Sequence, residues 1–158
     1  MSKEEKTIEQ LKFIASMFRM AMKEFDNVIG PESIQAIFRL IGERQGETVE
    51  KRMREKFNIE KWTPEEFADK FIKDVLEPAL GKEKSEITIN GNQLFVKIKV
   101  CPFKRAGIDI SDKYYCTYTE GVIDYAAKNA FGSTELITED LISEGNQCCQ
   151  YKIKIKTD

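Results

Sequence analysis

The chain has 158 residues, of which 41% are hydrophobic and 33% are charged, with 25 basic and 27 acidic side chains and a formal net charge of −2. This composition is typical of a globular domain with a charged surface. The balanced charge argues against a nucleic-acid binder, which would carry a basic stripe. The sequence contains no histidine. That absence excludes Ser-His-Asp and Cys-His nucleophilic sites and histidine-ligated zinc.

No apolar run reaches the roughly 20 residues that cross a bilayer. The first ten residues, MSKEEKTIEQ, are charged and helix-prone, unlike a secretory signal. We therefore expect a cytoplasmic protein without a transmembrane segment. In that compartment the four cysteines are expected to be reduced thiols, metal ligands or core residues rather than disulfides.

The first predicted element is a helix over residues 2–26, with Ser2 and Glu5 at capping-box positions. Its apolar side chains form a stripe wider than one neighbouring element would cover. The stripe consists of Ile8, Leu11, Phe13, Ile14, Met17, Phe18, Met20, Ala21, Met22 and Phe25. Two interpretations stay open: an ordinary core helix, or one that also contacts a ligand or a second copy of the chain.

A second helix is predicted to open at Pro31, a favoured first-turn position for proline. Gly42 and Gly46 are expected near its end. A shorter third helix is predicted at 47–57.

A fourth helix starts at Thr63, with Glu66 closing a second capping box. Pro78 and Gly81 are expected to mark its stop. The first half of the chain, residues 2–80, is thus predicted to be helical.

After Gly81 the hydrophobic period changes to alternation. The stretch EITINGNQLFVKIKV alternates around Asn90-Gly91, which predicts a hairpin with these two residues as its turn. A helix follows, headed by YYCTYTEG and stopping at Gly132. Two more strands are predicted, over 134–142 and 148–156.

Helices followed by a hairpin, rather than strictly alternating units, predict an α+β fold. We expect helices packed on a four-stranded antiparallel sheet. The whole chain, 1–158, is predicted to form a single domain, with the hairpin, the late helix and two strands in residues 83–157.

The cysteines can be sorted by the face on which each one lies. In the last strand Cys149 shares the inward parity of the apolar residues, and Cys148 does not. In the late helix Cys116 lies on the face of small apolar residues. Cys101 ends a strand, and Pro102 after it allows a turn. The spacing leaves two interpretations open: buried free thiols, or ligands of a metal ion.

The motifs VCPF, YYCTYTEG, SEG and CCQYKIKI resemble the 4-vinyl reductase, or hydrocarbon-binding, domain family over roughly residues 83–157. That family is related to the sensor domains of aromatic-responsive regulators and to palmitate-binding subunits of the Golgi transport particle. The resemblance implies a ligand-binding domain of the NO-signalling and Golgi-transport type, with a hydrophobic cavity between helices and sheet. It also implies a homodimer formed through helices.

The resemblance further implies a zinc ion beside the cavity, as in the regulator sensors. Cys116 and Cys149 match two of the expected ligands, whereas Thr138 and Leu141 stand where a Glu and a Cys are expected. A zinc site would therefore have to recruit other donors. The candidates for recruitment are Cys101, Cys148, Glu120 and Glu139, and the predicted metal set is Cys101, Cys116 and Cys149.

The leading hypothesis is a binding domain for a small hydrocarbon, aromatic or lipid-like ligand. Gly121 and the alanines of the late helix are interpreted as leaving room for it. The expected ligand contacts are Phe18, Met22, Val100, Phe103, Tyr118 and Val122.

Two alternatives come from other classes of protein. One is a cysteine- or metal-dependent enzyme, a reductase or a hydrolase, in which Lys113 and the helix N-terminus favour a Cys116 thiolate. The other is a dimeric adaptor with a structural role. No dinucleotide fingerprint is present to serve a reductase.

Overall fold

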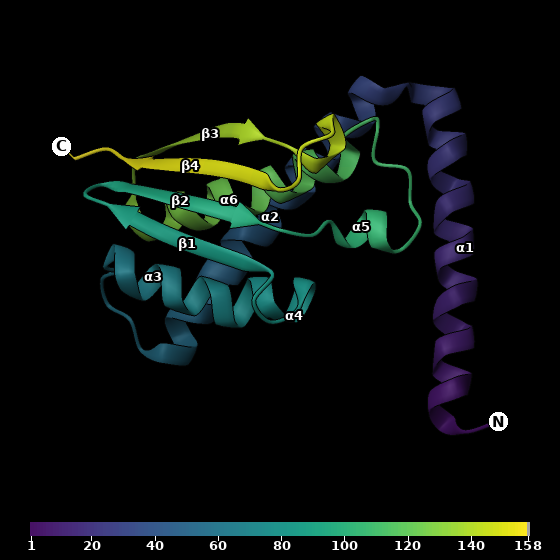
Figure 1. Cartoon of the computed structure of the whole chain (residues 1–158), viewed down its shortest axis with the longest axis horizontal. Helices are drawn as coiled ribbons and strands as arrows, with labels where there is room; N and C mark the ends of the chain where they lie inside the picture. The colour runs from purple at the N-terminus through teal and green to yellow at the C-terminus, as the bar shows by residue number, and fades with distance from the viewer. Residues whose placement is uncertain (158) are drawn as a thin grey trace. The chain divides into compact units, whose positions relative to one another are not determined.

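The computed structural model describes residues 1–157, which form two compact units, residues 1–34 and 35–157 (Figure 1). The first unit is built on α1 (Lys3–Ile29). Ser2 Oγ accepts the Glu5 N–H at 3.1 Å, and the Glu5 carboxylate accepts the Ser2 N–H, so the predicted capping box is confirmed. None of the helices within residues 1–157 is both long and apolar enough to cross a membrane.

The second unit contains a four-stranded antiparallel sheet in the order β1-β2-β4-β3 (Figure 1). Its strands are β1 (Ser85–Asn90), β2 (Gln93–Ile98), β3 (Thr134–Asp140) and β4 (Cys149–Ile155). Burial alternates along β2 and β4, with Cys149, Tyr151 and Ile153 buried, as the sequence parity predicts. The predicted α+β fold is confirmed.

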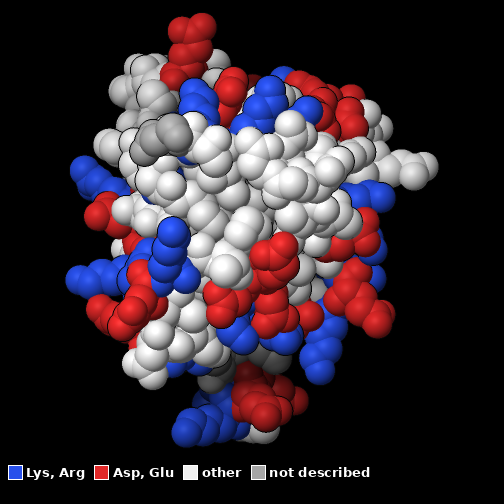
Figure 2. All heavy atoms as spheres, turned by 90° about the vertical axis from the view of Figure 1, so that its left-hand side faces the viewer, with Lys and Arg blue, Asp and Glu red and all other residues white. Residues whose placement is uncertain are grey.

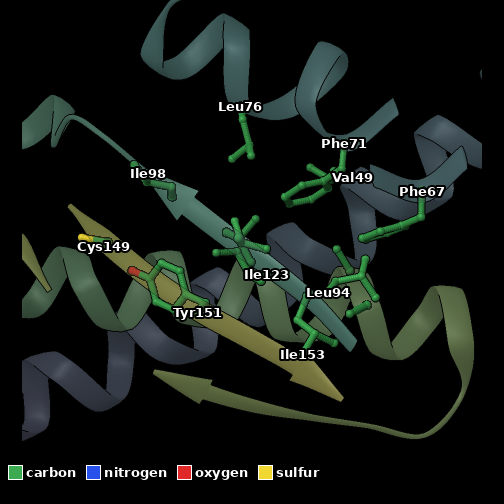
Figure 3. Packing of buried hydrophobic residues seen from close by; sticks show 14 of the residues in the cluster. Val49, Phe67, Phe71, Leu76, Leu94, Ile98, Ile123, Cys149, Tyr151 and Ile153 are labelled. Atoms are coloured by element: carbon green, nitrogen blue, oxygen red, sulfur yellow. The ribbon is translucent and has the colours of Figure 1, made fainter. Parts of the chain in front are cut away.

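The helices of this unit build the other layer. α6 (Tyr114–Phe131) packs on β3 and β4, and α3 (Pro64–Phe71) packs on β1. Figure 3 shows how side chains from both layers meet in the core. The labelled residues are Val49, Phe67, Phe71, Leu76, Leu94, Ile98, Ile123, Cys149, Tyr151 and Ile153.

The second and third predicted helices are one continuous element, α2 (Pro31–Phe57). The predicted end near Gly42 and Gly46 is therefore wrong. Both glycines lie inside α2 and allow it to approach α6 closely. A Cβ built on Gly46 would lie 2.5 Å from the Val122 carbonyl oxygen, and Gly42 faces the Tyr118 backbone at even shorter range.

The fourth helix starts as predicted, since Thr63 Oγ1 accepts the Glu66 N–H at 3.2 Å. It continues past α3 through the π-helical η1 (Ile72–Leu76) into α4 (Glu77–Leu80). Pro78 lies in the first turn of α4 and does not stop the helix. The π-helical turn comes directly before this proline, which cannot donate an ordinary helical hydrogen bond. Gly81, with φ of 100°, ends the helix.

The hairpin turn is displaced by one residue from the prediction. Asn90 pairs with Gln93, so the turn residues are Gly91 and Asn92. Gly91 adopts φ of 60°, and glycine is favoured at the first central position of such turns. Asn92 donates its side-chain N–H to the Ile155 carbonyl at 2.8 Å, which ties the turn to the end of β4.

Two short elements flank the late helix. α5 (Pro102–Arg105) follows β2, and the 3-10 helix η2 (Ile142–Glu144) connects β3 to β4. On the surface, Figure 2 shows basic and acidic side chains interspersed around an uncharged area. This face therefore carries no field of a single sign.

Candidate functional site

A cavity of about 500 Å³ lies inside the second unit and is lined mainly by apolar side chains. Its walls come from α2, the α3–η1–α4 segment, the end of β2, α5, α6 and β4. Representative lining residues are Val49, Phe71, Leu76, Ile98, Val122 and Tyr151. We call this space the apolar cavity. Its size is within the range that small-molecule sites occupy.

Three of the four cysteines line the apolar cavity. Cys101 is the residue before α5, Cys116 lies in the first turn of α6, and Cys149 begins β4 opposite Ile98. Cys148 is half-buried and is not part of the lining. The fold thus brings together the three cysteines that the sequence singles out.

The thiols of Cys116 and Cys149 are held in their neutral form. The Cys116 thiol donates to Ser143 Oγ at 3.3 Å, and Cys149 Sγ accepts the Ile142 N–H at 3.3 Å. Burial raises the pKa of Cys116, and the contact with Ser143 offsets only part of that effect. Burial likewise raises the pKa of Cys149. Neither thiol is a ready thiolate at neutral pH.

The proposed activation of Cys116 by Lys113 is not supported. Lys113 Nζ lies 2.6 Å from Glu144 Oε1, so its charge is already paired. Cys116 lies in the first turn of α6, and burial is the largest influence on its thiol, raising the pKa. Cys116 is therefore better suited to form part of the wall of a binding cavity than to act as a nucleophile.

The structure places the predicted ligand contacts in two regions. Val100, Phe103, Tyr118 and Val122 line the apolar cavity. The Phe103 ring stacks on Tyr115, with ring centroids 4.3 Å apart, and fixes one wall.

The other two predicted contacts, Phe18 and Met22, lie on α1 in the first unit. Phe18 is 39% exposed and Met22 is buried. Ligand contact by all six residues stays a prediction.

The interpretation of Gly121 requires a correction. A Cβ on Gly121 would lie 2.6 Å from the Arg39 carbonyl oxygen and 2.8 Å from the Glu43 backbone nitrogen. The missing side chain therefore lets α6 pack against α2 and does not make room for a ligand. The room arises on the other side of α6.

Several lining residues are not among the predicted ligand contacts. Phe71, Val75, Leu76 and Leu80 come from the α3–η1–α4 segment, whose π-helical turn widens the helix next to the cavity. The available signal in the sequence was Pro78, because a proline inside a helix disturbs the regular hydrogen bonding. The π-helical turn that precedes Pro78 is of a kind that is frequent at functional sites.

The donor atoms for a metal do not converge. Within residues 1–157, no three Cys, Asp or Glu side chains form a group that could hold a metal ion. Glu120 is half-buried, accepts a hydrogen bond from Thr138 Oγ1 at 3.1 Å and is not part of the cavity lining. As placed, these residues do not form a zinc site. Zinc binding by Cys101, Cys116 and Cys149 stays a prediction for metal analysis of the purified protein.

Comparison with known proteins relates both sequence and fold to other chains. A family model described as L-2-amino-thiazoline-4-carboxylic acid hydrolase matches residues 8–153. No curated protein matches the chain.

Among solved structures, the chain is similar to trafficking protein particle complex subunit 3 from Naegleria fowleri, which was solved covalently bound to palmitic acid. The two are 13% identical with a TM-score of 0.66, and the match covers 96% of this chain and 97% of that one. The expected relation to Golgi transport subunits is thus supported at the level of fold. The 4-vinyl reductase family itself is not shown.

Proposed function

Since the chain belongs to the L-2-amino-thiazoline-4-carboxylic acid hydrolase family, we propose its role from the geometry of its own site. We propose that it binds a small hydrocarbon, aromatic or acyl-chain ligand in the apolar cavity. The observation that carries this proposal is a space of about 500 Å³ lined mainly by apolar side chains.

The chemistry of the lining favours such a ligand. Each methylene group that a ligand buries there contributes about 0.8 kcal/mol before the cost of ordering it. Tyr115 and Tyr118 combine an apolar ring with a polar hydroxyl, which suits an apolar ligand with one polar end. Burial raises the pKa of both phenols, so they are neutral hydrogen-bonding groups at neutral pH.

The palmitic acid of the trafficking subunit supports the same ligand class, because that chain shares this fold. In the present chain the neutral state of Cys116 and Cys149 favours non-covalent binding. A covalent adduct would be visible as a mass increase of the denatured protein.

Displacement of a fluorescent fatty acid, followed as a titration, tests the proposal. Val100→Trp is expected to lower the affinity at least about tenfold, because the indole occupies the cavity that Val100 lines. Ile137→Trp is the matched control, since Ile137 pairs with Lys152 on the outer parity of the sheet and is not part of the lining. Equal affinities for the two variants would contradict the proposal.

A second candidate is the hydrolysis that the family description names, favoured by a match over most of the chain. The compound in that description carries a carboxylate, which an apolar lining suits poorly. Incubation of the protein with L-2-amino-thiazoline-4-carboxylic acid, followed by mass spectrometry, tests it. Turnover abolished by a single substitution would establish the activity. No turnover at high enzyme concentration would exclude it.

We also propose that α1 mediates a homodimer. The first unit contains one long helix, which cannot bury its own apolar stripe, and Phe13 and Met20 are 75% and 68% exposed. Met17→Glu is expected to yield a monomer in light scattering after size exclusion. Arg19→Glu is the control, because it introduces the same acidic side chain two residues away, at a position outside the apolar stripe. A monomeric wild-type protein at micromolar concentration would contradict the proposal.

A further inference from the structure

A second hollow of about 400 Å³ lies in the same unit and has the opposite character to the apolar cavity. It is bounded by α2, α6, β3 and the residue that follows β4. Its charged lining residues are Arg39, Glu120, Asp124, Lys128, Glu135 and Lys156. We call it the polar hollow. It shares no lining residue with the apolar cavity, so nothing said of it rests on the ligand proposed above.

Asp124 is the most buried charged residue of the polar hollow, at 4% exposure. Its Oδ2 atom accepts hydrogen bonds from Arg39 and from Lys128, the latter at 2.9 Å. Its Oδ1 atom is buried and has no hydrogen-bond partner among residues 1–157. A buried carboxylate oxygen without a donor is unfavourable, and each such group in a folded protein requires an explanation.

Thr134, at the start of β3, repeats this situation in the same hollow. Its side chain is buried, and its hydroxyl has no partner in the described part of the chain. Three side-chain atoms within residues 1–157 share this state, and the third, Ser85 Oγ, is outside the hollow. Two residues that each carry a buried polar atom without a partner therefore line one space.

The residues around these groups define what could satisfy them. Asp124 Oδ1 only accepts, so a ligand must present an N–H or O–H donor to it. Lys156 is exposed and forms no ion pair with another described residue. Its ammonium group is available for an anion at the rim of the hollow.

We propose that the polar hollow binds a small zwitterion with a cationic N–H group and a carboxylate, as in a free α-amino acid. The N–H group donates to Asp124 Oδ1 and Thr134 Oγ1, and the carboxylate contacts Lys156. The three basic and three acidic lining residues balance each other, which suits a ligand without net charge.

Calorimetric titration of the full chain with L-alanine tests this proposal, with propionate and ethylamine as probes that each lack one charged group. L-alanine is expected to bind at least about tenfold, or 1.4 kcal/mol, more tightly than either. Failure of L-alanine to bind, or equal binding of all three probes, would overturn the proposal.

Variants locate the binding. Thr134→Val removes a hydroxyl that makes no bond within the described chain, so folding is retained, and the affinity for L-alanine is expected to fall about tenfold. Ser85→Ala removes the third unpartnered hydroxyl and is expected to leave the affinity unchanged. Lys156→Gln is expected to weaken L-alanine and not ethylamine. Equal effects of Thr134→Val and Ser85→Ala would show that the alanine binds elsewhere, which overturns the proposal.

Discussion

The two faces of α6 differ in how closely they are packed, and the sequence of the helix does not show this difference. Towards α2 the helix is packed at backbone distance, because Gly121 meets the α2 backbone while Gly42 and Gly46 meet the α6 backbone. Towards the sheet and the α3–η1–α4 segment the same helix borders the apolar cavity through Cys116, Thr119 and Ile123. The smallest side chains therefore mark the tightest contact, and larger ones surround the space.

The largest expected effect comes from adding a methyl group on the packed side. Gly121→Ala would favour the helix by about 0.5–1 kcal/mol on propensity alone. The new Cβ, however, would lie 2.6 Å from a backbone carbonyl oxygen that cannot move independently. Overpacking costs typically 1–3 kcal/mol, and we place this site at the upper end of that range because the partner atoms belong to the backbone. After the gain in propensity, we expect a net loss of about 2 kcal/mol in the free energy of unfolding, measured in urea. A stabilised variant would contradict the close crossing.

A larger substitution on the cavity side sharpens the comparison. Thr119→Leu lies two residues away on the same helix, adds more volume and removes only a hydrogen bond to the Tyr115 carbonyl within the helix. We expect a change below about 1 kcal/mol in the same urea experiment, because the added atoms enter the cavity. A loss equal to that of Gly121→Ala would show that this side is packed as tightly as the other.

Alkaline pH should act on the cavity side of α6. Burial raises the pKa values of Cys116, Cys149 and Tyr151, so the folded state retains these protons to higher pH than the unfolded chain. Their contribution to stability is complete below the unfolded thiol pKa of about 8.5 and is lost as pH rises above it, with the phenol following above about 10.

Tyr151→Phe is expected to reduce the later part of this decline, above about pH 10, while Tyr115 and Tyr118, whose pKa values burial also raises, still contribute to it. Urea unfolding across the alkaline range measures the stability of the wild type and of this variant. If the tyrosine variant lost stability with pH as steeply as the wild type, burial of the phenol would not be the cause.

The smallest expected effect is on thiol reactivity. With its pKa raised by burial, Cys116 should react with iodoacetamide at pH 7 more slowly than free cysteine. Peptide mapping after timed labelling gives the rate for each cysteine. Labelling faster than the free amino acid would restore the thiolate hypothesis.

Features that depend on a few neighbouring residues were predictable from the sequence. Both capping boxes and the inward parity of Cys149 follow local rules, and the structure has them as expected. Gly42 and Gly46 were misjudged for a different reason. A glycine inside a helix destabilises it locally, and only the partner helix, distant in sequence, shows why it is needed.

The apolar cavity and the polar hollow also differ in how far local sequence rules predict them. The three cysteines around the apolar cavity could be grouped by parity and by their positions at element ends. The polar hollow could not be predicted, because the lack of hydrogen-bond partners at Asp124 and Thr134 is a property of the assembled fold.

Native mass spectrometry of the freshly purified full chain tests the ligand-binding proposal most directly. The account predicts a complex with a small apolar compound that is released on denaturation, and a Val100→Trp protein without it. Wild-type and Val100→Trp proteins that carry the same compound, or a wild-type protein that binds no fatty acid or aromatic when these are added, would contradict it.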